Sequence, residues 1–453
     1  MRCGGEEAKV DPWFLQKRHW LAPLRAARPA TGAPAETTLD RLVHDHAEDD
    51  PESAEHRESF GFTLRLGRAL LRFGLPAQRL EEALVRVAHA LGFDLDCFST
   101  PTALILTFSD GFRRGTRVVR VEPGDTDLER LTALHALVGR VERRELSPAD
   151  ASRRLERIIA RASRYPGTLM VGATGLASTA ASALLGGGLV DLLPAFGLGL
   201  LVGGLREAAR RVPTLGRILP ALAAMLATLA ARVVHVTGVP VHETVLVLAA
   251  VIVLLPGFAL TTATMELASA NVVSGTARLV GAFATLVQLG FGVALGARLA
   301  MLVPTVAASG TAAAPEWLVW MGYGLVVLGF TVLLQAAPRE LPAIFVAAAL
   351  AVAGARLGKI WLGPEVGAFL GALFIGLASH VYARAQDRPV LLLLTPGILM
   401  LVPGSVGFLS VASMLEADVI TALQTAFRAV LIATALAAGV LVATVAVPPR
   451  RAL

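Results

Sequence analysis

The chain has 453 residues, 55% of them hydrophobic, and a mean hydropathy of +0.63, which excludes an ordinary soluble globular protein. Its net charge of +6 does not indicate nucleic-acid binding, because residues 1–165 hold 26 basic against 25 acidic side chains and no basic patch interleaved with aromatic residues. Two cysteines, Cys3 and Cys97, are too few for a disulfide framework or a Cys-rich metal site.

The charges are unevenly spread along the chain. Residues 1–165 contain 51 Asp, Glu, Lys and Arg side chains, whereas the remaining 288 residues contain only 25. We therefore predict a water-facing N-terminal part and a lipid-embedded C-terminal part. No continuous apolar segment of a secretory signal opens the chain, so the N-terminal part is expected to stay cytoplasmic.

Residues 1–58 are rich in Ala, Pro and charge and are predicted to form a mostly disordered tail. His44 and His46 stand beside acidic residues there, but a solvated tail is favoured over a metal site. We expect neither a metal nor another cofactor.

Residues 59–165 are predicted to form a small cytoplasmic α+β domain. The stretch 62–92 has the pattern of two amphipathic helices, and three runs rich in β-formers follow at 97–100, 103–109 and 117–123. A capping box is predicted at Thr126 and Glu129. Ser147, which precedes Pro148, is predicted to begin a last helix that runs to residue 164.

This domain shows no catalytic signature. It contains no nucleophile elbow, phosphate loop or HExxH motif. His89 and His135 lie on predicted helices without the spacing of metal ligands, so packing or exposed histidines are favoured. We therefore predict that the protein is not an enzyme.

From Thr168 onward, uncharged stretches alternate with short charged loops, which is the pattern of a polytopic α-helical membrane protein. The clearest spans are 168–190, 244–265, 279–297, 317–338, 389–415 and 429–449. Weaker spans are 192–205, 218–231, 341–355 and 366–383. About ten transmembrane helices are therefore expected. With the N-terminus inside, ten Arg residues fall in cytoplasmic loops and five Arg or Lys residues on the other side, which predicts that both termini are cytoplasmic.

The membrane part is predicted to be duplicated. At an offset of 140 residues, Pro256-Gly257 aligns with Pro396-Gly397. At the same offset, small residues repeat every four positions: Ala223, Ala227 and Ala231 align with Gly363, Gly367 and Gly371. Two five-helix halves, 166–310 and 311–449, follow from this alignment. Because five is odd, the second half would be inverted relative to the first.

Paired interrupted helices in inverted repeats point to a secondary transporter with its substrate site at mid-membrane. Proline and glycine would open the helices and leave backbone groups facing a cavity, although a simple kink between packed helices is the alternative. The residues predicted to bind or conduct the substrate are Pro256, Gly257, Thr261, Thr262, Asn271, Pro396, Gly397, Pro403, Gly404 and Ser405.

Three charged residues and one amide accompany these breaks. Glu266 is the candidate for proton coupling, because burial would raise the pKa of a carboxyl in the membrane. Glu266 and Arg278 could equally belong to a solvated interfacial loop. Arg428 aligns with Gln288 in the repeat. This pair would orient the carboxylate of a substrate. Alternatively, Arg428 would extend outward to the membrane interface.

Four segments of the chain resemble the threonine/serine exporter family (ThrE). They are FTLRLGRALLRFGLPAQRLEEALVRVAHALG and STPTALILTF in the α+β domain, VLLPGFALTTATMELASANVVSGTARL in the first half and TPGILMLVPGSVGFLS in the second. The resemblance covers roughly residues 60–448 and implies a multi-pass protein of the bacterial inner membrane that exports threonine and serine, driven by the proton gradient. In the family the first half often carries an acidic residue near position 271, where this chain has Asn.

Two other functions remain open at this point. Relatives in which the two halves are separate chains are linked to dicarboxylate export, and an exporter of succinate-like dicarboxylates would turn Arg278 or Arg428 toward the cavity. A membrane-anchored enzyme would need a catalytic constellation in residues 60–164, which the sequence does not supply. The expected partners are a small amino acid, protons and the lipid bilayer, with no nucleic acid, and a homo-oligomer is compatible with the sequence.

Overall fold

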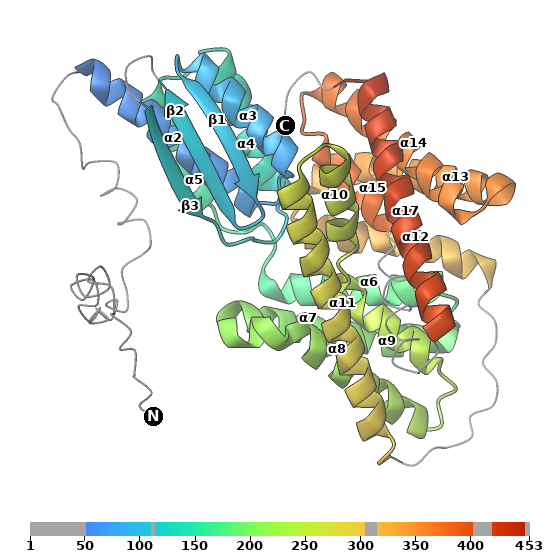
Figure 1. The fold of residues 1–453 in the computed structure, drawn as a ribbon. Helices are drawn as coiled ribbons and strands as arrows, with labels where there is room; N and C mark the ends of the chain where they lie inside the picture. The colour runs from blue at the N-terminus through green and yellow to red at the C-terminus, as the bar shows by residue number, and fades with distance from the viewer. Residues whose placement is uncertain (1–50, 110–113, 304–314, 402–418, 449–453) are drawn as a thin grey trace, which may run out of the picture. The chain divides into compact units, whose positions relative to one another are not determined.

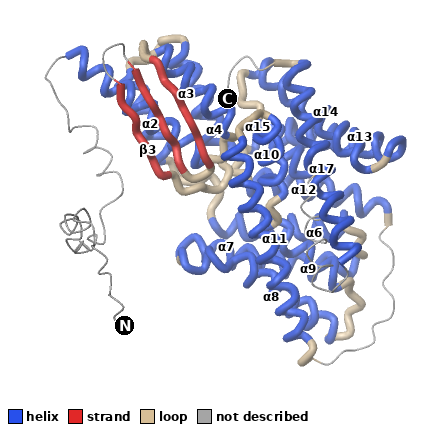
Figure 2. The backbone as a smooth tube through the Cα atoms, in the orientation of Figure 1, coloured by secondary structure: helices blue, strands red, loops and turns tan. Residues whose placement is uncertain are grey.

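The computed structural model describes residues 51–109, 114–303, 315–401 and 419–448. The chain divides into two compact units, residues 1–54 and residues 55–453, and the first lies almost entirely outside the described residues. Within the part predicted as a tail, the structure describes only residues 51–58, which are helical. Figures 1 and 2 show the fold: three strands lie side by side in one sheet, and the chain that follows is helical.

Four helices and one sheet form the α+β domain. The helices are α2 (Pro51–Arg72), α3 (Ala77–Ala90), α4 (Leu128–Glu142) and α5 (Pro148–Ala160). The strands are β1 (Asp94–Thr100), β2 (Ala103–Ser109) and β3 (Arg114–Arg120), antiparallel in the order β1-β2-β3. The apolar face of α3 predicted from its period is buried, since Leu80, Leu84 and Val87 are 0% exposed. They form the core together with Leu104 and Leu106 of β2.

Of the two helix starts predicted in this domain, one is confirmed and one is wrong. Ser147 caps α5 as predicted, and its side chain accepts the Asp150 N–H at 3.1 Å. The capping box predicted at Thr126 is wrong. Asp127 instead takes the extended cap conformation, and its carboxylate accepts the Arg130 N–H at 2.9 Å. Burial raises the pKa of Asp127 above its usual range.

Eight of the described helices are long and apolar enough to cross a membrane, or nine spans when one bent pair is counted as a span. The eight are α6 (Gly167–Leu184), α7 (Leu189–Arg211), α8 (Pro213–Val236), α11 (Val272–Ala300), α12 (Glu316–Leu333), α13 (Leu341–Leu362), α14 (Pro364–Gln386) and α17 (Val419–Ala446). The four weaker predicted spans are thus full-length helices. The predicted span 389–415 is described only up to Leu401, where it contains the short helix α15 (Leu391–Met400).

The bent pair is the span that contains Pro256-Gly257. It consists of α9 (Glu243–Val251), the 3-10 turn η3 (Ile252–Leu254) and α10 (Gly257–Ala268), with a bend of 54° at the break. A second 3-10 turn, η4 (Pro338–Glu340), precedes α13.

Small residues allow the long helices to approach closely. On α8, Ala223, Ala227 and Ala231 are 0% exposed, and α8 packs against α11, where a Cβ on Gly292 would lie 2.1 Å from the Ala221 carbonyl oxygen. On α14, a Cβ on Gly371 would lie 2.8 Å from the Ala351 carbonyl oxygen of α13. The small-residue spacing seen in the sequence therefore marks close helix contacts in both halves.

Candidate functional site

The break between α9 and α10 follows from Pro256. The residue before a proline avoids the helical region, and Leu255 is extended with φ −65° and ψ 128°. The helix resumes at Gly257, and the first α10 bond runs from the Leu260 N–H to the Pro256 carbonyl at 2.9 Å. The three amides from Gly257 to Ala259 precede this bond and form the N-terminus of α10.

A cavity of about 350 Å³ lies at this break, and we call it the central cavity. Both halves of the membrane part contribute to its walls, together with the segment just before α4. Its lining residues are Asp125, Thr126, Ala177, Ala181, Leu184, Leu185, Arg206, Ile252, Val253, Leu255, Phe258, Val326, Phe330, Leu333, Leu334, Thr395, Leu399 and Met400. The walls are thus mainly apolar, with a few polar groups that could orient a ligand.

Thr395 on α15 is the most buried of these polar groups. It is 1% exposed, and its Oγ1 has no hydrogen-bond partner among the described residues. The neighbouring Pro396 has no N–H, so the Leu392 carbonyl also lacks its usual helical donor. Buried polar groups are ordinarily paired, so this unpaired hydroxyl is a candidate ligand-binding group, although the oxygen itself is buried behind the cavity wall in this structure.

A second cavity lies where the α+β domain meets the membrane helices, and we call it the junction cavity. Its volume is about 480 Å³, and it shares Asp125, Thr126 and Leu333 with the central cavity. Its other lining residues are Arg72, Phe73, Pro123, Gly124, Asp127, Arg130, Ser163, Met170, Arg210 and Gln335. Arg206 forms an ion pair with Asp125 at 2.9 Å, and both residues line the central cavity. Asp125 also lines the junction cavity.

Glu266, at the end of α10, joins the first half to the α+β domain. The Arg278 Nε donates to both of its carboxylate oxygens, at 3.0 and 2.9 Å, and the Ser274 hydroxyl donates at 3.0 Å. The Ala77 N–H, the first amide of α3, donates to the same carboxylate at 3.0 Å. Glu266 is only 2% exposed, so its buried carboxylate links α10 to α11 through the ion pair with Arg278 and to α3 through the hydrogen bond from Ala77.

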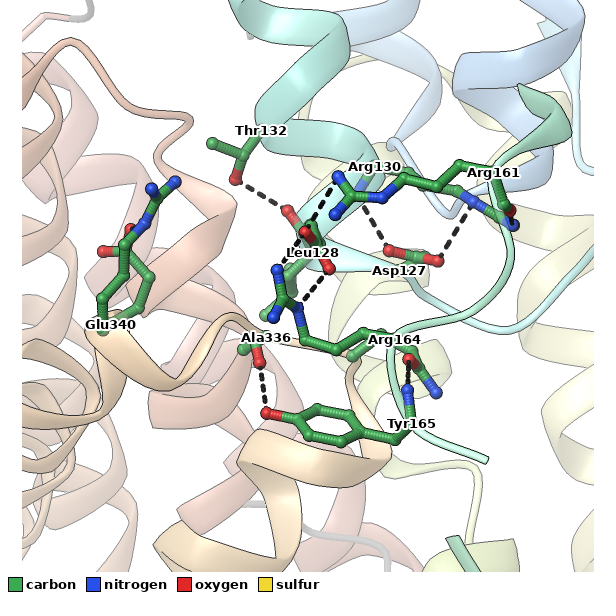
Figure 3. A network of polar contacts seen from close by, with 12 residues as sticks. Asp127, Leu128, Arg130, Thr132, Arg161, Arg164, Tyr165, Ala336 and Glu340 are labelled. Carbon is green, nitrogen blue, oxygen red and sulfur yellow. Dashed lines mark hydrogen bonds and ion pairs between the residues drawn. The ribbon is translucent and has the colours of Figure 1, made fainter. Parts of the chain in front are cut away.

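The second half is fastened to the α+β domain by a different set of contacts (Figure 3). The Tyr165 hydroxyl donates to the Ala336 carbonyl at 2.9 Å, and the Tyr165 N–H donates to the Gln335 Oε1 at 3.1 Å. The Leu128 N–H donates to the Leu334 carbonyl at 3.0 Å. The α+β domain therefore contacts both halves, beside the cavities that lie between them.

The structure confirms the predicted interruption at Pro256 and Gly257. Thr261 and Thr262 are buried in α10, but the Thr261 hydroxyl donates to the Gly257 carbonyl of its own helix at 3.2 Å. Neither threonine lines the central cavity. Asn271 occupies the N-cap position of α11 without a capping hydrogen bond from its side chain, and its N–H donates to the Glu266 carbonyl at 2.8 Å.

The predicted interruption at Pro396 and Gly397 is wrong, because both residues lie inside α15. Gly397 instead allows close packing, since a Cβ there would lie 2.3 Å from the Ile375 Cγ1 of α14. Pro403, Gly404 and Ser405 lie outside the described residues.

The predicted supporting residues are not brought together. Arg428 lies 3.4 Å from the Glu365 carboxylate, and the buried Gln288 Oε1 has no hydrogen-bond partner in the described part of the chain. Neither residue lines the central cavity, and nor does Arg278.

Sequence reasoning missed Thr395, Asp125 and Arg206. Thr395 is the one polar side chain in LLLLTPGILM, which was a usable signal. Asp125 belongs to the PGDTD segment, whose acids have the pattern of a helix start, and no local signal indicates that this segment reaches the membrane helices.

Comparison with known proteins gives two matches that together span both parts of the chain. Residues 61–300 match the family described as "Putative threonine/serine exporter" (ThrE), and residues 321–446 match a second family described as "Threonine/Serine exporter, ThrE". No solved structure matches the chain.

Curated relatives are fungal proteins named pheromone-regulated membrane protein 10. The protein from Eremothecium gossypii is 33% identical over 145 residues, 31% of this chain and 20% of its own length. That from Candida albicans is 34% identical over 148 residues, 32% of this chain and 13% of its own length. The chain thus spans a fifth or less of these relatives. Since the first family match alone covers more than half of the chain, this multi-pass membrane protein belongs to the threonine/serine exporter family.

Proposed function

We propose that the protein exports threonine and serine through the central cavity, driven by the proton gradient, by alternating access between residues 166–310 and 311–449. One observation carries this proposal: Leu255 and Phe258, which flank the helix break at Pro256, and Thr395, whose hydroxyl is unpaired, come from different halves and line the same cavity. Relative motion of the halves would therefore open and close the site.

The chemistry of the two cavities suits a small hydroxylated zwitterion. In the junction cavity, Arg72 and Arg210 can attract the carboxylate of the substrate, and Asp125 and Asp127 can attract its ammonium group. In the central cavity, the Thr395 hydroxyl can pair with the hydroxyl of threonine or serine. The N-terminus of α10, which begins between the lining residues Leu255 and Phe258, favours a carboxylate.

Ten spans in two inverted repeats fit this mechanism. The helix pairs α8–α11 and α14–α17 both pack closely through small residues, and they correspond at an offset of about 147 residues rather than the 140 predicted from the Pro-Gly pairs, since Gly439 takes the place of Gly292. On α17, a Cβ on Gly439 would lie 2.4 Å from the Phe369 carbonyl oxygen of α14, as Gly292 does against Ala221 on the first pair. These matching contacts support an internal duplication.

We infer that Glu266 is the proton carrier. A proton on its carboxylate would remove the charge that Arg278 contacts and weaken its hold on the Ala77 amide. Proton binding would thereby loosen α10 from α3 and free the first half to move. The arrangement supplies a physical link between a proton and the helix that forms the cavity.

We propose a bacterial inner-membrane location, as the resemblance to the exporter family implies, and the distribution of Arg and Lys supports an orientation with both termini in the cytoplasm. In this orientation the α+β domain and the junction cavity face the cytoplasm, the side from which an exporter must load its substrate.

Efflux measurements test the function directly. Cells loaded with a Thr- or Ser-containing dipeptide should release the amino acid faster when the protein is expressed, and an uncoupler should abolish the increase. Faster release of succinate with unchanged release of both amino acids would instead establish the dicarboxylate exporter.

The proton carrier is tested with matched variants. Glu266→Gln should retain passive exchange of threonine and lose its response to the proton gradient. Glu243→Gln is the control, because Glu243 pairs with Arg232 at 3.0 Å and does not line the central cavity. Intact proton-driven efflux in Glu266→Gln would exclude Glu266 as the carrier.

A further inference from the structure

An arginine-lined groove lies between α4 and α5 and shares Arg130 with the junction cavity. Its volume is about 350 Å³, and five of its ten lining residues are arginines. The full lining set is Glu129, Arg130, Ala133, Ala136, Leu137, Arg140, Arg154, Arg157, Ile158 and Arg161. We propose that this groove binds a phosphate-bearing ligand.

The single acid of the groove does not neutralise it. Glu129 is contacted by Arg161 at 3.1 Å and by Arg164, which lies outside the groove, at 2.5 Å. The hydrogen bond from Arg164 holds the pKa of Glu129 below its usual range. Its charge is therefore already engaged, and four further arginines line the same groove: Arg130, Arg140, Arg154 and Arg157.

Two of these arginines make no direct ion pair with an acid among the described residues, although Arg154 lies near enough to Asp150 to interact with its charge. Arg130 lies 3.5 Å from Asp127, and Arg140 lies 3.2 Å from Glu145. Arg157 donates only to the carbonyl of Arg153, at 3.3 Å, and Arg154 makes no ion pair within the described ranges. Like charges gathered at one groove repel, and a bound anion would relieve that repulsion.

The shape and chemistry of the groove indicate the class of anion. Guanidinium groups form bidentate hydrogen bonds with phosphate oxygens, and several together favour a ligand with more than one negative charge. Leu137, Ile158 and Ala133 give the groove an apolar floor beside the arginines. A free diphosphate and the phosphate headgroup of a lipid share the chemistry that this lining recognises.

The groove is coupled to the membrane helices through its own residues. Glu129 and Arg161 line the groove, and Arg164, which holds Glu129, precedes Tyr165 in the chain. Tyr165 in turn holds the Ala336 carbonyl beyond α12, as Figure 3 shows. A ligand that competes with Glu129 for Arg161 would therefore act on the contact between the α+β domain and the second half.

The test uses the full-length protein with pyrophosphate as the soluble probe and phosphatidylglycerol as the lipid probe. Binding of pyrophosphate is measured calorimetrically in nanodiscs of phosphatidylcholine. The melting temperature is then compared between nanodiscs with and without phosphatidylglycerol. The test variant is Arg154→Gln/Arg157→Gln, and the control is Arg144→Gln/Arg153→Gln, which removes two arginines that do not line the groove.

We expect at least one probe to bind the parent protein and the control equally. The test variant should bind it about tenfold more weakly for each guanidinium removed. Binding of pyrophosphate identifies a soluble phosphate ligand, and a melting-temperature shift with phosphatidylglycerol alone identifies a lipid headgroup. Absence of both effects in the parent, or equal losses in the test and control variants, would overturn the proposal.

Discussion

The same dipeptide, Pro-Gly, has different structural consequences in the two halves of the membrane part. Pro256-Gly257 ends one helix and begins another with a 54° bend, whereas Pro396-Gly397 lies within the continuous helix α15. In the first half the residue before proline is extended, so the backbone opens. In the second half the helix continues, and Gly397 serves close packing against Ile375. One half thus contributes a backbone break to the cavity, and the other contributes the side chain of Thr395.

Replacing each proline should produce the largest difference between the halves. Pro256→Ala restores a helical donor at the break and lets α9 continue into α10, so we expect efflux of threonine to be lost. Pro396→Ala removes an internal helix breaker that costs up to about 3 kcal/mol, so we expect retained efflux and a higher melting temperature. Efflux and thermal unfolding of the two variants check this prediction, and equal loss of efflux in both would contradict it.

The role of Gly397 is tested by adding one methyl group. Gly397→Ala places a Cβ 2.3 Å from Ile375, and we expect a loss of about 1–3 kcal/mol of stability from overpacking. Gly281→Ala on α11 is the control, because a Cβ there meets no atom within 4 Å. Adding Ile375→Ala should recover part of the loss, as measured by thermal unfolding. No recovery would mean that Gly397 is needed for its backbone rather than for packing.

The two buried threonines differ in what their hydroxyls contact: that of Thr395 has no partner among the described residues, and that of Thr261 donates within its own helix. Thr395→Val keeps the shape and removes the unpaired hydroxyl, so we expect about fivefold weaker apparent affinity for threonine, equivalent to roughly 1 kcal/mol. Thr261→Val removes a hydroxyl bonded within α10 and should change the affinity much less. The KM values for efflux decide between them, and a larger effect at Thr261 would place the substrate elsewhere.

The smallest expected effect is at Glu129, near the contact between the α+β domain and the second half of the membrane part. Glu129→Gln removes the charge paired with Arg164 and should cost about 0.5–1 kcal/mol at neutral pH. Because the folded pKa of Glu129 is depressed, its stabilisation is present above the ordinary value of 4.5 and is lost as the pH falls through the folded value. The difference in melting temperature between the parent and the variant should therefore shrink below pH 4.5. A constant difference would contradict the ion-pair account.

Much of the fold followed from local patterns. The uncharged stretches predicted the long helices, the β-rich runs predicted the sheet, and Ser147 predicted a helix start. Each of these features depends on residues that are close together in the sequence. Asp127 replaced Thr126 as a cap because both can accept the same amides, and the backbone conformation decides between them.

The candidate site was less accessible from the sequence. Pro256 marked the break correctly, but the pattern at Pro396 did not reveal that tertiary packing keeps α15 helical. The cavity depends on contacts between distant segments, such as Arg206 with Asp125, and these leave no local signal.

The central claim is that the central cavity between the two halves holds the substrate. Phe258→Cys on α10 and Leu399→Cys on α15 place one thiol on each side of this cavity. Both are made in a background without Cys3 and Cys97, although burial raises the pKa of Cys97 to about 12 and so keeps its thiol largely protonated. Val442→Cys on α17, where the side chain is 46% exposed, serves as the control.

The decisive measurement is the rate of alkylation by N-ethylmaleimide in membranes with and without substrate. We predict that threonine and serine slow alkylation at both cavity positions and leave the rate at position 442 unchanged. Alkylation at positions 258 and 399 that neither amino acid slows, in variants that still export threonine, would contradict the account.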